Sequence, residues 1–370
     1  MKRLVLCGGG HTHVEVLRRF GLRPVPGVEL VLVSPNRFTP YSGMLPGLIA
    51  GHYRFDQVHL DLERVTHFAG ARFLQTLVTG FDPRSRVVTL ADGATLAFDV
   101  ASLDVGSRPP TDGIPGAEEH AIGVKPVEPF LRVSGQWLER ARAGTRLAVV
   151  GGGAGGVETL LSMQHRFRRE TGRADAVECH LVTDVDQVLP DHGARAQAIF
   201  RRILAERGVE LHLASRVVRV EAGTVHAANG LVVRAHAIVW ATGAAPLPLL
   251  RATGLALDAA GFVAVNGRLQ SISHGHVFAA GDCATIVGHP RPKSGVYAVR
   301  EGPPLAANLR AALGGRPLVR YVPQKHALAL ISTGNRYAVA SRGSFAVEGA
   351  WVWWWKNWVD RRFVRRYATL

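Results

Sequence analysis

GGGHTH at residues 8–13 and GGGAGG at residues 151–156 are the two stretches that decide the fold of this chain. Each follows a short, mainly apolar run, residues 3–7 in the first case and 147–150 in the second, and leads into a segment with helical spacing. A strand, a tight glycine turn and a helix N-terminus in this order bind a dinucleotide pyrophosphate, because unpaired helix N–H groups point at the phosphates. Two such turns predict two dinucleotides that exchange electrons within one chain.

The first turn matches this pattern in two of its three glycine positions. Gly8 permits the tight bend and Gly10 lets the backbone approach the phosphates, whereas the third position holds His13. The following strand ends at Ser34, where an acidic residue usually binds the ribose hydroxyls. Serine forms hydrogen bonds without the help of a charge. We assign His11, at the start of the helix, to the same cofactor site.

The second turn is complete. Its three glycine positions hold Gly151, Gly153 and Gly156. The strand after it ends at Thr183 and Asp184, so Asp184 is the expected ribose ligand and Thr183 the alternative. No arginine occurs at residues 185–189 to bind a 2′-phosphate, which favours NADH over NADPH.

Composition narrows the class of protein. The chain has 370 residues, 47% hydrophobic and 20% charged, as in a globular protein of two or three domains. No apolar run approaches 18 residues, and the apolar start is too short for a signal peptide. The net charge of +15 fits either a basic proteome or attraction to an anionic membrane surface. No nucleic-acid-binding motif accompanies the charge, so nucleic acid is not an expected partner.

The cysteines, the proline- and glycine-rich segments and the apolar spacing give further expectations. Cys7, Cys179 and Cys283 lack any disulfide or metal-ligand spacing, which favours the cytoplasm and predicts no metal site. Residues 35–60, rich in proline and glycine, are expected to form loop and turns. Apolar spacing predicts a helix over 127–143 and a strand over 176–183.

Further motifs follow the first turn in a fixed order. They are Gly106-Ser107-Arg108-Pro109, the second turn, Ala241-Thr242-Gly243 and Gly281-Asp282. This ordered set, covering residues 1–310, resembles the two-dinucleotide flavoproteins of the pyridine nucleotide-disulfide oxidoreductase superfamily. The resemblance implies an α/β fold with two Rossmann-like domains and FAD on the first. It also implies that Asp282 contacts the flavin's ribityl chain, with Gly106, Ser107, Gly243 and Gly281 at the cofactor sites.

The resemblance also divides the chain. The FAD-binding domain is expected in two parts, 1–115 and 265–315, and the NAD(P)H-binding domain is the insert 116–264. Residues 316–370 form a small C-terminal extension with a tail rich in tryptophan and arginine.

Within the superfamily, two groups are most similar. Gly155-Gly156-Val157-Glu158 resembles the helix start of type II NADH dehydrogenases. GGGHTH, the segment 39–46 ending at Pro46, and the tail resemble the flavoprotein found beside or fused to selenide, water dikinase. The second likeness implies a link to selenium metabolism, and with it Pro46 is assigned to the cofactor site.

Departures from the family pattern exclude some activities. Residues 40–51 contain no cysteine, so the dithiol relay of a disulfide reductase is not expected. Residues 295–301 lack both glutamines of the quinone-site element that type II NADH dehydrogenases carry. A quinone site of that design is therefore in doubt.

Three side chains are the catalytic candidates. Glu158 follows the second turn and is placed near the junction of the two rings, although a carboxylate there also suits a helix start. Lys293 and Tyr297, together with Arg300, follow the Gly281-Asp282 motif, where a cation stabilises reduced flavin. Solvated surface residues are the alternative for this group.

The tail, Trp351–Tyr367, has its own pattern. Read as a helix, Trp351, Trp354, Trp355 and Trp358 share one face, which Arg362, Arg365 and Arg366 continue. Tryptophans giving way to arginines suit the interface of a bilayer, at the inner face of the cell membrane. The alternatives are packing on the flavin domain or on a second subunit of a homodimer.

These observations lead to one expected reaction and two alternatives. The expected reaction is hydride transfer from NADH to FAD, with electrons then delivered to a quinone as the favoured acceptor. The first alternative is a soluble NADH-dependent reductase of a small or protein acceptor, with selenium compounds among the candidates. The second is a non-catalytic partner that binds flavin and NADH and reports redox state.

Overall fold

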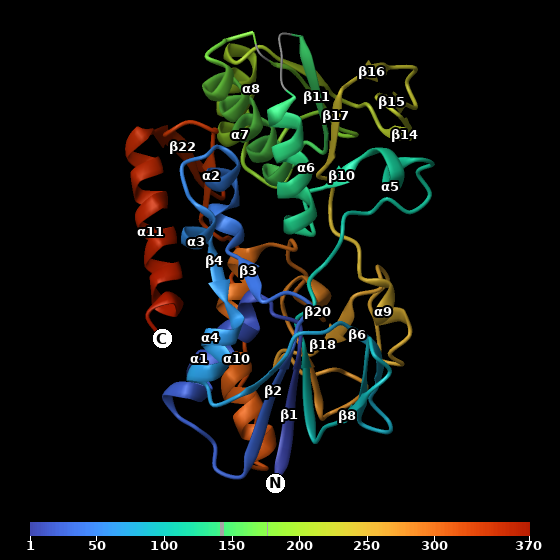
Figure 1. The fold of residues 1–370 in the computed structure, drawn as a ribbon, viewed down its shortest axis with the longest axis vertical. Helices are drawn as coiled ribbons and strands as arrows, with labels where there is room; N and C mark the ends of the chain where they lie inside the picture. The colour runs from blue at the N-terminus through green and yellow to red at the C-terminus, as the bar shows by residue number, and fades with distance from the viewer. Residues whose placement is uncertain (141–143, 176) are drawn as a thin grey trace.

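The computed structural model describes residues 1–140, 144–175 and 177–370. The first glycine turn follows the central strand of a five-stranded parallel sheet (Figure 1). Residues 4–7 of that strand are fully buried, as its continuous apolar run requires of a strand covered on both faces. In order, the strands are β19 (Val277–Ala279), β9 (Val100–Leu103), β1 (Lys2–Cys7), β2 (Val28–Val33) and β5 (Arg72–Leu74).

Helices cover one side of this sheet and an antiparallel sheet covers the other (Figure 1). Helix α1 (His11–Leu22) connects β1 to β2 and packs against α10 (Gly295–Leu313), which lies far away in sequence. The first core is thus built from segments before and after the second domain. The antiparallel sheet consists of β6 (Val78–Asp82), β7 (Val87–Leu90) and β8 (Thr95–Ala97).

The second glycine turn lies on a second five-stranded parallel sheet. Its strands, in order, are β10 (Ile122–Gly123), β17 (Ala237–Trp240), β11 (Thr145–Val150), β12 (Val177–Val182) and β13 (Val209–His212). Its helices are α6 (Val127–Glu139), α7 (Ala154–Thr171) and α8 (Ala194–Glu206). A three-stranded antiparallel sheet accompanies them, formed by β14 (Val217–Glu221), β15 (Thr224–Ala227) and β16 (Val232–Arg234). The α/β class with two Rossmann-like sheets is confirmed. The expected helix over 127–143 and strand over 176–183 extend onto residues 141–143 and 176, which lie outside the described residues.

The chain crosses between the two domains twice, and the crossings touch. Arg108 and Ala245 form an antiparallel bridge, with N···O distances of 2.9 Å and 2.7 Å. After the second crossing, Leu250, Leu255 and Val263 pack into the first core. Helix α5 (Ala117–His120) follows the first crossing. The second crossing is followed by α9 (Pro248–Arg251), β18 (Val263–Val265), η2 (Gly281–Cys283) and β20 (Ala284–Ile286).

Residues 35–60 contain more regular structure than their composition predicts. The segment folds as β3 (Phe38–Pro40), η1 (Ser42–Met44), α2 (Leu45–Ile49), α3 (Phe55–Val58) and the first residues of β4 (His59–Asp61). Leu45 and Ile49 of α2 pack into the second core, against α7. The expectation of loop and turns alone is wrong here, because apolar side chains between the prolines and glycines become buried at the domain junction.

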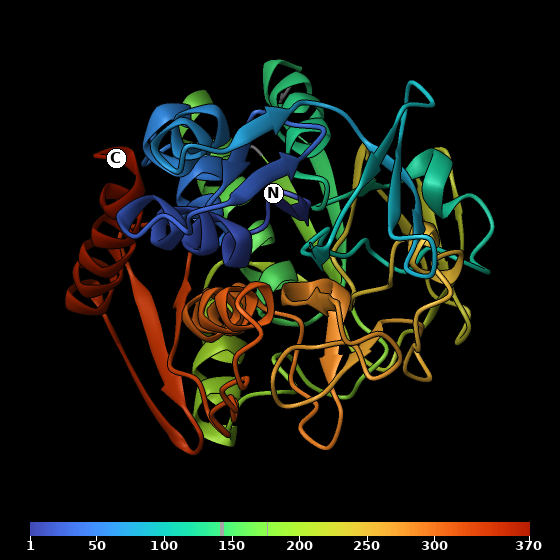
Figure 2. The ribbon, with the colours of Figure 1, turned by 90° about the horizontal axis from the view of Figure 1, so that it is seen from below.

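The C-terminal extension joins both domains. Its antiparallel sheet contacts α7 and α8, and its last helix runs down the side of the molecule toward α4 (Leu62–Phe68) (Figures 1 and 2). Its elements are β21 (Ala329–Ser332), β22 (Ala338–Arg342), β23 (Phe345–Gly349) and α11 (Ala350–Ala368). In the part of the chain that the structure describes, no helix combines the length and apolar character needed to cross a bilayer.

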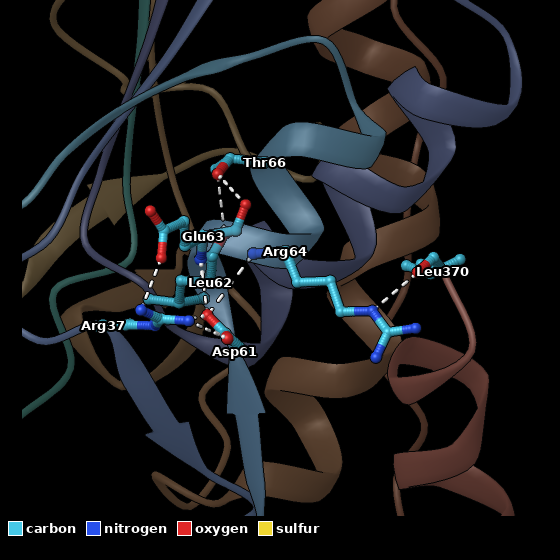
Figure 3. Close-up of polar contacts among 7 residues, drawn as sticks. All are labelled: Arg37, Asp61, Leu62, Glu63, Arg64, Thr66 and Leu370. Carbon is cyan, nitrogen blue, oxygen red and sulfur yellow. Dashed lines mark hydrogen bonds and ion pairs between the residues drawn. The ribbon is translucent and has the colours of Figure 1, made fainter.

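Polar contacts fix the end of α11 to the first domain (Figure 3). Asp61 caps α4 (Leu62–Phe68) by accepting hydrogen bonds from the N–H groups of Glu63 and Arg64. Arg37 forms ion pairs of 2.7 Å with both Asp61 and Glu63. Arg64 Nε donates to the Leu370 carbonyl at 2.8 Å, so the capped helix holds the chain terminus in place.

Candidate functional site

The first glycine turn is closed by a carboxylate from a neighbouring strand. Asp104, directly after β9, accepts hydrogen bonds from the N–H groups of Thr12 and His13 at 3.0 Å and 3.2 Å. A Cβ at Gly8, where φ is +98°, would lie 2.3 Å from the Asp104 carbonyl oxygen. A Cβ at Gly10 would lie 2.3 Å from the Asp104 carboxylate. Both glycines are needed for this close approach, and sequence reasoning missed Asp104.

Asp104 belongs to a group of buried acids. Burial raises the pKa of Asp104 to about 7, and Asp282 adds to this effect. Burial likewise raises the pKa of Glu301 to about 8, and its carboxylate accepts the Gly281 N–H at 2.7 Å. The first turn therefore lies beside carboxyl groups that hold protons near neutral pH.

Two histidines at the first turn remain neutral. His13 is fully buried, with Nδ1 2.7 Å from the Gly8 carbonyl and Nε2 2.8 Å from Ser102 Oγ. Burial lowers the pKa of His13 to about 4. His13 thus replaces the third glycine by joining the turn to β9. Burial, followed by repulsion from Lys125, lowers the pKa of His11 to about 4.

At two positions of the second turn, only glycine fits without a steric clash. A Cβ at Gly156 would lie 1.9 Å from the Gly151 carbonyl, and one at Gly151 would lie 2.4 Å from the Ala241 carbonyl. A Cβ at Gly153 would meet no described atom within 4 Å, so the turn is open at this position. Thr183 is buried against Gly152, whereas Asp184 is exposed just beyond the end of β12.

Asp282 is held by residues from two other segments. Its Oδ2 lies 2.6 Å from Lys125 Nζ and accepts a hydrogen bond from Ser107 Oγ at 3.1 Å. Burial opposes ionisation of Asp282, but Lys125 and Ser107 more than offset this and lower the pKa of the carboxyl. Asp282 is therefore a carboxylate, positioned as a hydrogen-bond acceptor.

A pocket beside Asp282 contains two of the catalytic candidates. Lys293, Tyr297 and Glu301 line it together with Asp282. Lys293 Nζ donates to the Ala284 carbonyl and, at 2.8 Å, to Thr285 Oγ1, and burial lowers its pKa. Arg300 is exposed instead, as the surface alternative predicts.

Glu158 lies in a different cluster, formed with the last helix. Its Oε1 accepts the Ser332 N–H at 2.7 Å. Burial raises the pKa of Glu158 to about 7, while Lys356 opposes this shift. Lys356 and Asp360 form a buried ion pair of 2.6 Å, and Lys356 also donates to the Gly43 carbonyl. The sequence analysis missed this i,i+4 pair, because it considered only the face of the same helix that carries the tryptophans.

The buried face of α11 packs on the first turn. The ring of Phe363 stacks on Tyr41 at 4.2 Å between centroids and lies 6.2 Å from the ring of His11. Tyr367 Oη donates to Glu15 Oε2 at 2.9 Å. The predicted face lies outside: Trp351, Trp354, Trp355 and Trp358 are 57%, 56%, 37% and 58% exposed.

The assigned cofactor residues fall into two main groups. Around the first turn lie Gly8, Gly10, His11, Ser34, Gly106, Ser107, Gly281 and Asp282. Around the second turn lie Gly151, Gly153, Gly156, Asp184 and Gly243. Ser34 is buried and donates to the Asn36 carbonyl at 3.1 Å. Pro46 is buried in α2.

The residues at both turns fit the two dinucleotides. His11 Nε2 and Thr242 Oγ1 are buried polar atoms that find no hydrogen-bond partner among the described residues. Each lies at one of the two turns, where a bound dinucleotide would supply a partner. Each glycine turn precedes a helix of at least twelve residues. The N-terminal N–H groups of α7 suit a pyrophosphate, whereas in α1 those of Thr12 and His13 donate to Asp104.

The three cysteines are buried and are not suited to thiol chemistry. Cys7, Cys179 and Cys283 are buried, and burial raises the pKa of each thiol to about 12. At neutral pH these groups are thiols rather than the thiolates that disulfide exchange needs.

Known proteins are similar to this chain in sequence. The NADH dehydrogenase-like protein YutJ of Bacillus subtilis is 25% identical over 333 residues, which cover 88% of this chain and 87% of the relative. The demethylphylloquinone reductase NdbB of Synechocystis is 27% identical over 350 residues, covering 90% of this chain and 85% of the relative.

The fold is also shared with a solved structure. The sulfide:quinone oxidoreductase of Aquifex aeolicus superposes with a TM-score of 0.82, at 18% identity, over 99% of this chain and 91% of its own. A sequence profile that spans both glycine turns and the Gly281-Asp282 motif matches residues 2–302. By this match the chain belongs to the pyridine nucleotide-disulphide oxidoreductase family.

Proposed function

We propose that this protein is an FAD-dependent NADH dehydrogenase that delivers electrons to a quinone. One observation carries the proposal: the last helix brings side chains near both dinucleotide turns. Lys356 on α11 lies near enough to Glu158, which follows the second turn on α7, to oppose the rise in its pKa, and the ring of Phe363 on the same helix lies 6.2 Å from the ring of His11 at the first turn. The names of YutJ and NdbB support both halves of the reaction, NADH oxidation and quinone reduction.

The chain's own residues position the cofactors. When bound, FAD supplies the redox chemistry by taking a hydride from NADH and returning two electrons to an acceptor. Asp282, held as a carboxylate by Lys125, accepts hydrogen bonds from a polyol such as the ribityl chain. Lys293 brings a positive charge to the same pocket, where it stabilises negative charge on a reduced ring.

The second turn favours NADH over NADPH. Asp184 is exposed just beyond the second turn's strand, where a carboxylate binds ribose hydroxyls and repels a 2′-phosphate. Thr183, buried against Gly152, contributes a second polar group at this position.

Glu158 is the group that handles a proton. Reducing a quinone to a quinol consumes two protons along with two electrons. With its pKa raised to about 7, the Glu158 carboxyl both holds and releases a proton near neutral pH. The charge of Lys356, which is paired with Asp360, opposes the rise in the pKa of Glu158 and so favours release of the proton.

The exposed tryptophans support contact between this side of the molecule and a membrane surface. Four large rings on one face of α11 lie next to Arg362, Arg365 and Arg366, which are also exposed. Tryptophan rings sit at headgroup depth, and guanidinium groups bind lipid phosphates. A quinone dissolved in the bilayer would then reach the side of the molecule that α11 covers.

Steady-state NADH oxidation with a panel of acceptors tests this function. We expect turnover with quinones to exceed turnover with oxygen and with selenium compounds, and NADH to exceed NADPH in kcat/KM. Selenium compounds are included because of the likeness to the flavoprotein associated with selenide, water dikinase. Quinone turnover no faster than oxygen turnover would reject a quinone reductase. Failure of NADH to reduce the bound flavin within seconds would reject an enzyme and favour a redox-sensing partner.

A further inference from the structure

Two histidines and two glutamates gather at the edge of the second parallel sheet, on β12 and β13. Alternate residues of a strand share one face, so Glu178 and His180 on β12 lie on one side, as do Glu210 and His212 on β13. The parallel register pairs His180 with Glu210. Because β13 is the edge strand, this group is open toward solvent.

The spacing of three ligand atoms matches the needs of one metal ion. His180 Nδ1 lies 3.2 Å from His212 Nε2 and 3.3 Å from Glu210 Oε2, and the last two atoms are 3.9 Å apart. The point equidistant from all three therefore lies about 2.0 Å from each atom. This distance is the usual bond length from Zn²⁺ to imidazole nitrogen or carboxylate oxygen.

The surrounding groups suit a metal ligand set. Metal-bound histidines usually direct their second nitrogen at a carboxylate. His180 is 6% exposed, and its Nε2 lies 3.2 Å from Glu178 Oε1 without an aligned hydrogen bond to any described residue. Glu210, 57% exposed, leaves a path from solvent.

We propose that His180, His212 and Glu210 bind a divalent transition-metal ion of the Zn²⁺ class, with Glu178 orienting His180. Imidazole and carboxylate ligands suit Zn²⁺, and a water molecule from the open side completes the coordination. The ion would tie the edge strand β13 to β12. Thr183, next to the second glycine turn, donates its N–H to the His212 carbonyl at 3.0 Å, so the ion would also stiffen the strand ends beside that turn.

Zinc binding by the full-length, flavin-loaded protein tests the proposal. The chain has 16 histidines, so the decisive quantity is the difference between matched variants. His226 is the control, because it pairs with Glu221 at 3.0 Å in the same domain and its side chain is 21% exposed, against 19% for His212. Calorimetric titration with Zn²⁺, and metal analysis after dialysis, give the affinity and the stoichiometry.

We expect His212→Ala and Glu210→Gln to lose one equivalent of bound Zn²⁺ and His226→Ala to retain it. Glu178→Gln is expected to keep the site with about 10- to 100-fold weaker affinity, because it removes only the orienting group. Zn²⁺ should raise the melting temperature of the wild type and of His226→Ala, but not that of His212→Ala or Glu210→Gln. Equal stoichiometry and affinity in His212→Ala and the wild type would overturn the proposal. Should His212→Ala lose its flavin, Glu210→Gln, altered at an exposed side chain, decides the question by the same measurement.

Discussion

At the scale of single residues, the Lys356–Asp360 pair dominates the energetics of the site, because both side chains are buried. Lys356→Met is expected to lower the free energy of unfolding by about 3–5 kcal/mol, since an uncompensated buried charge remains. The double variant Lys356→Met/Asp360→Leu removes both charges and should recover most of that loss. Urea unfolding of the three proteins measures this. If the single and double variants lose the same free energy of unfolding, the unpaired charge of Asp360 is not what destabilises the single variant.

A second residue-scale prediction concerns the glycines of the second turn. Gly156→Ala places a Cβ 1.9 Å from the Gly151 carbonyl, so the turn must shift. We expect the KM for NADH to rise by about 10- to 100-fold while flavin content is unchanged. Gly155→Ala is the matched control, because its Cβ would meet no atom of the described chain within 4 Å. Similar KM values for the two variants would contradict this steric role of Gly156.

The third residue-scale prediction concerns pH. Burial raises the pKa of Glu301 from 4.5 to about 8, so the folded protein holds a proton here that the unfolded chain releases. Because the folded state binds the extra proton, Glu301 makes stability fall as pH rises between these values, by up to about 1.4 kcal/mol per pH unit. Glu301→Gln keeps an acceptor for the Gly281 N–H and should reduce this fall. Melting temperatures at about pH 5.5 and about pH 7.5 measure the difference; an unchanged fall in the variant would show that Glu301 is ionised throughout.

At the scale of the element, α11 has two faces with separate tasks. The face of Val352, Lys356, Asp360 and Phe363 is buried, whereas the four-tryptophan face is exposed. Replacing Trp351, Trp354, Trp355 and Trp358 by Ser should therefore leave the fold intact and abolish flotation with liposomes. Deleting residues 351–370 should also remove the buried contacts and destabilise the protein.

Controls separate a lipid contact from a protein contact on this face. Replacing the buried Phe363 by Leu leaves the tryptophan face unchanged and should preserve flotation. Sedimentation without lipid shows whether a homodimer buries the same rings. A tryptophan variant that floats as well as the wild type would reject the membrane contact.

At the scale of the whole molecule, a net charge of +15 should determine how membrane binding depends on salt. Binding to anionic vesicles is expected to weaken markedly at about 0.5 M NaCl, because salt screens charges at a solvated surface. Reduction of the flavin by NADH depends on groups inside the protein and should change little. Vesicle flotation and stopped-flow absorbance at low and high salt measure both. Salt-independent flotation on anionic vesicles would show that the basic surface contributes nothing.

The sequence by itself determined the local parts of this protein. Each glycine turn is a contiguous strand–turn–helix unit, so its backbone requirements are visible in neighbouring residues such as Gly151 and Gly156. The tryptophan face of α11 was also predictable, because helical spacing alone decides which residues share a face.

Only the tertiary structure decided which distant residues meet. Asp104 lies at the end of a strand about ninety residues after the turn it closes, and no local pattern distinguishes it from other strand-end acids. The electrostatic effect of Lys356 on Glu158 and the geometry of the His180–Glu210–His212 group each involve separate elements, so they follow from sheet order and domain packing. Residues that are neighbours in the sequence determine backbone turns and the faces of helices. In contrast, pKa values and metal-ligand sets depend on burial and on atoms that folding brings together.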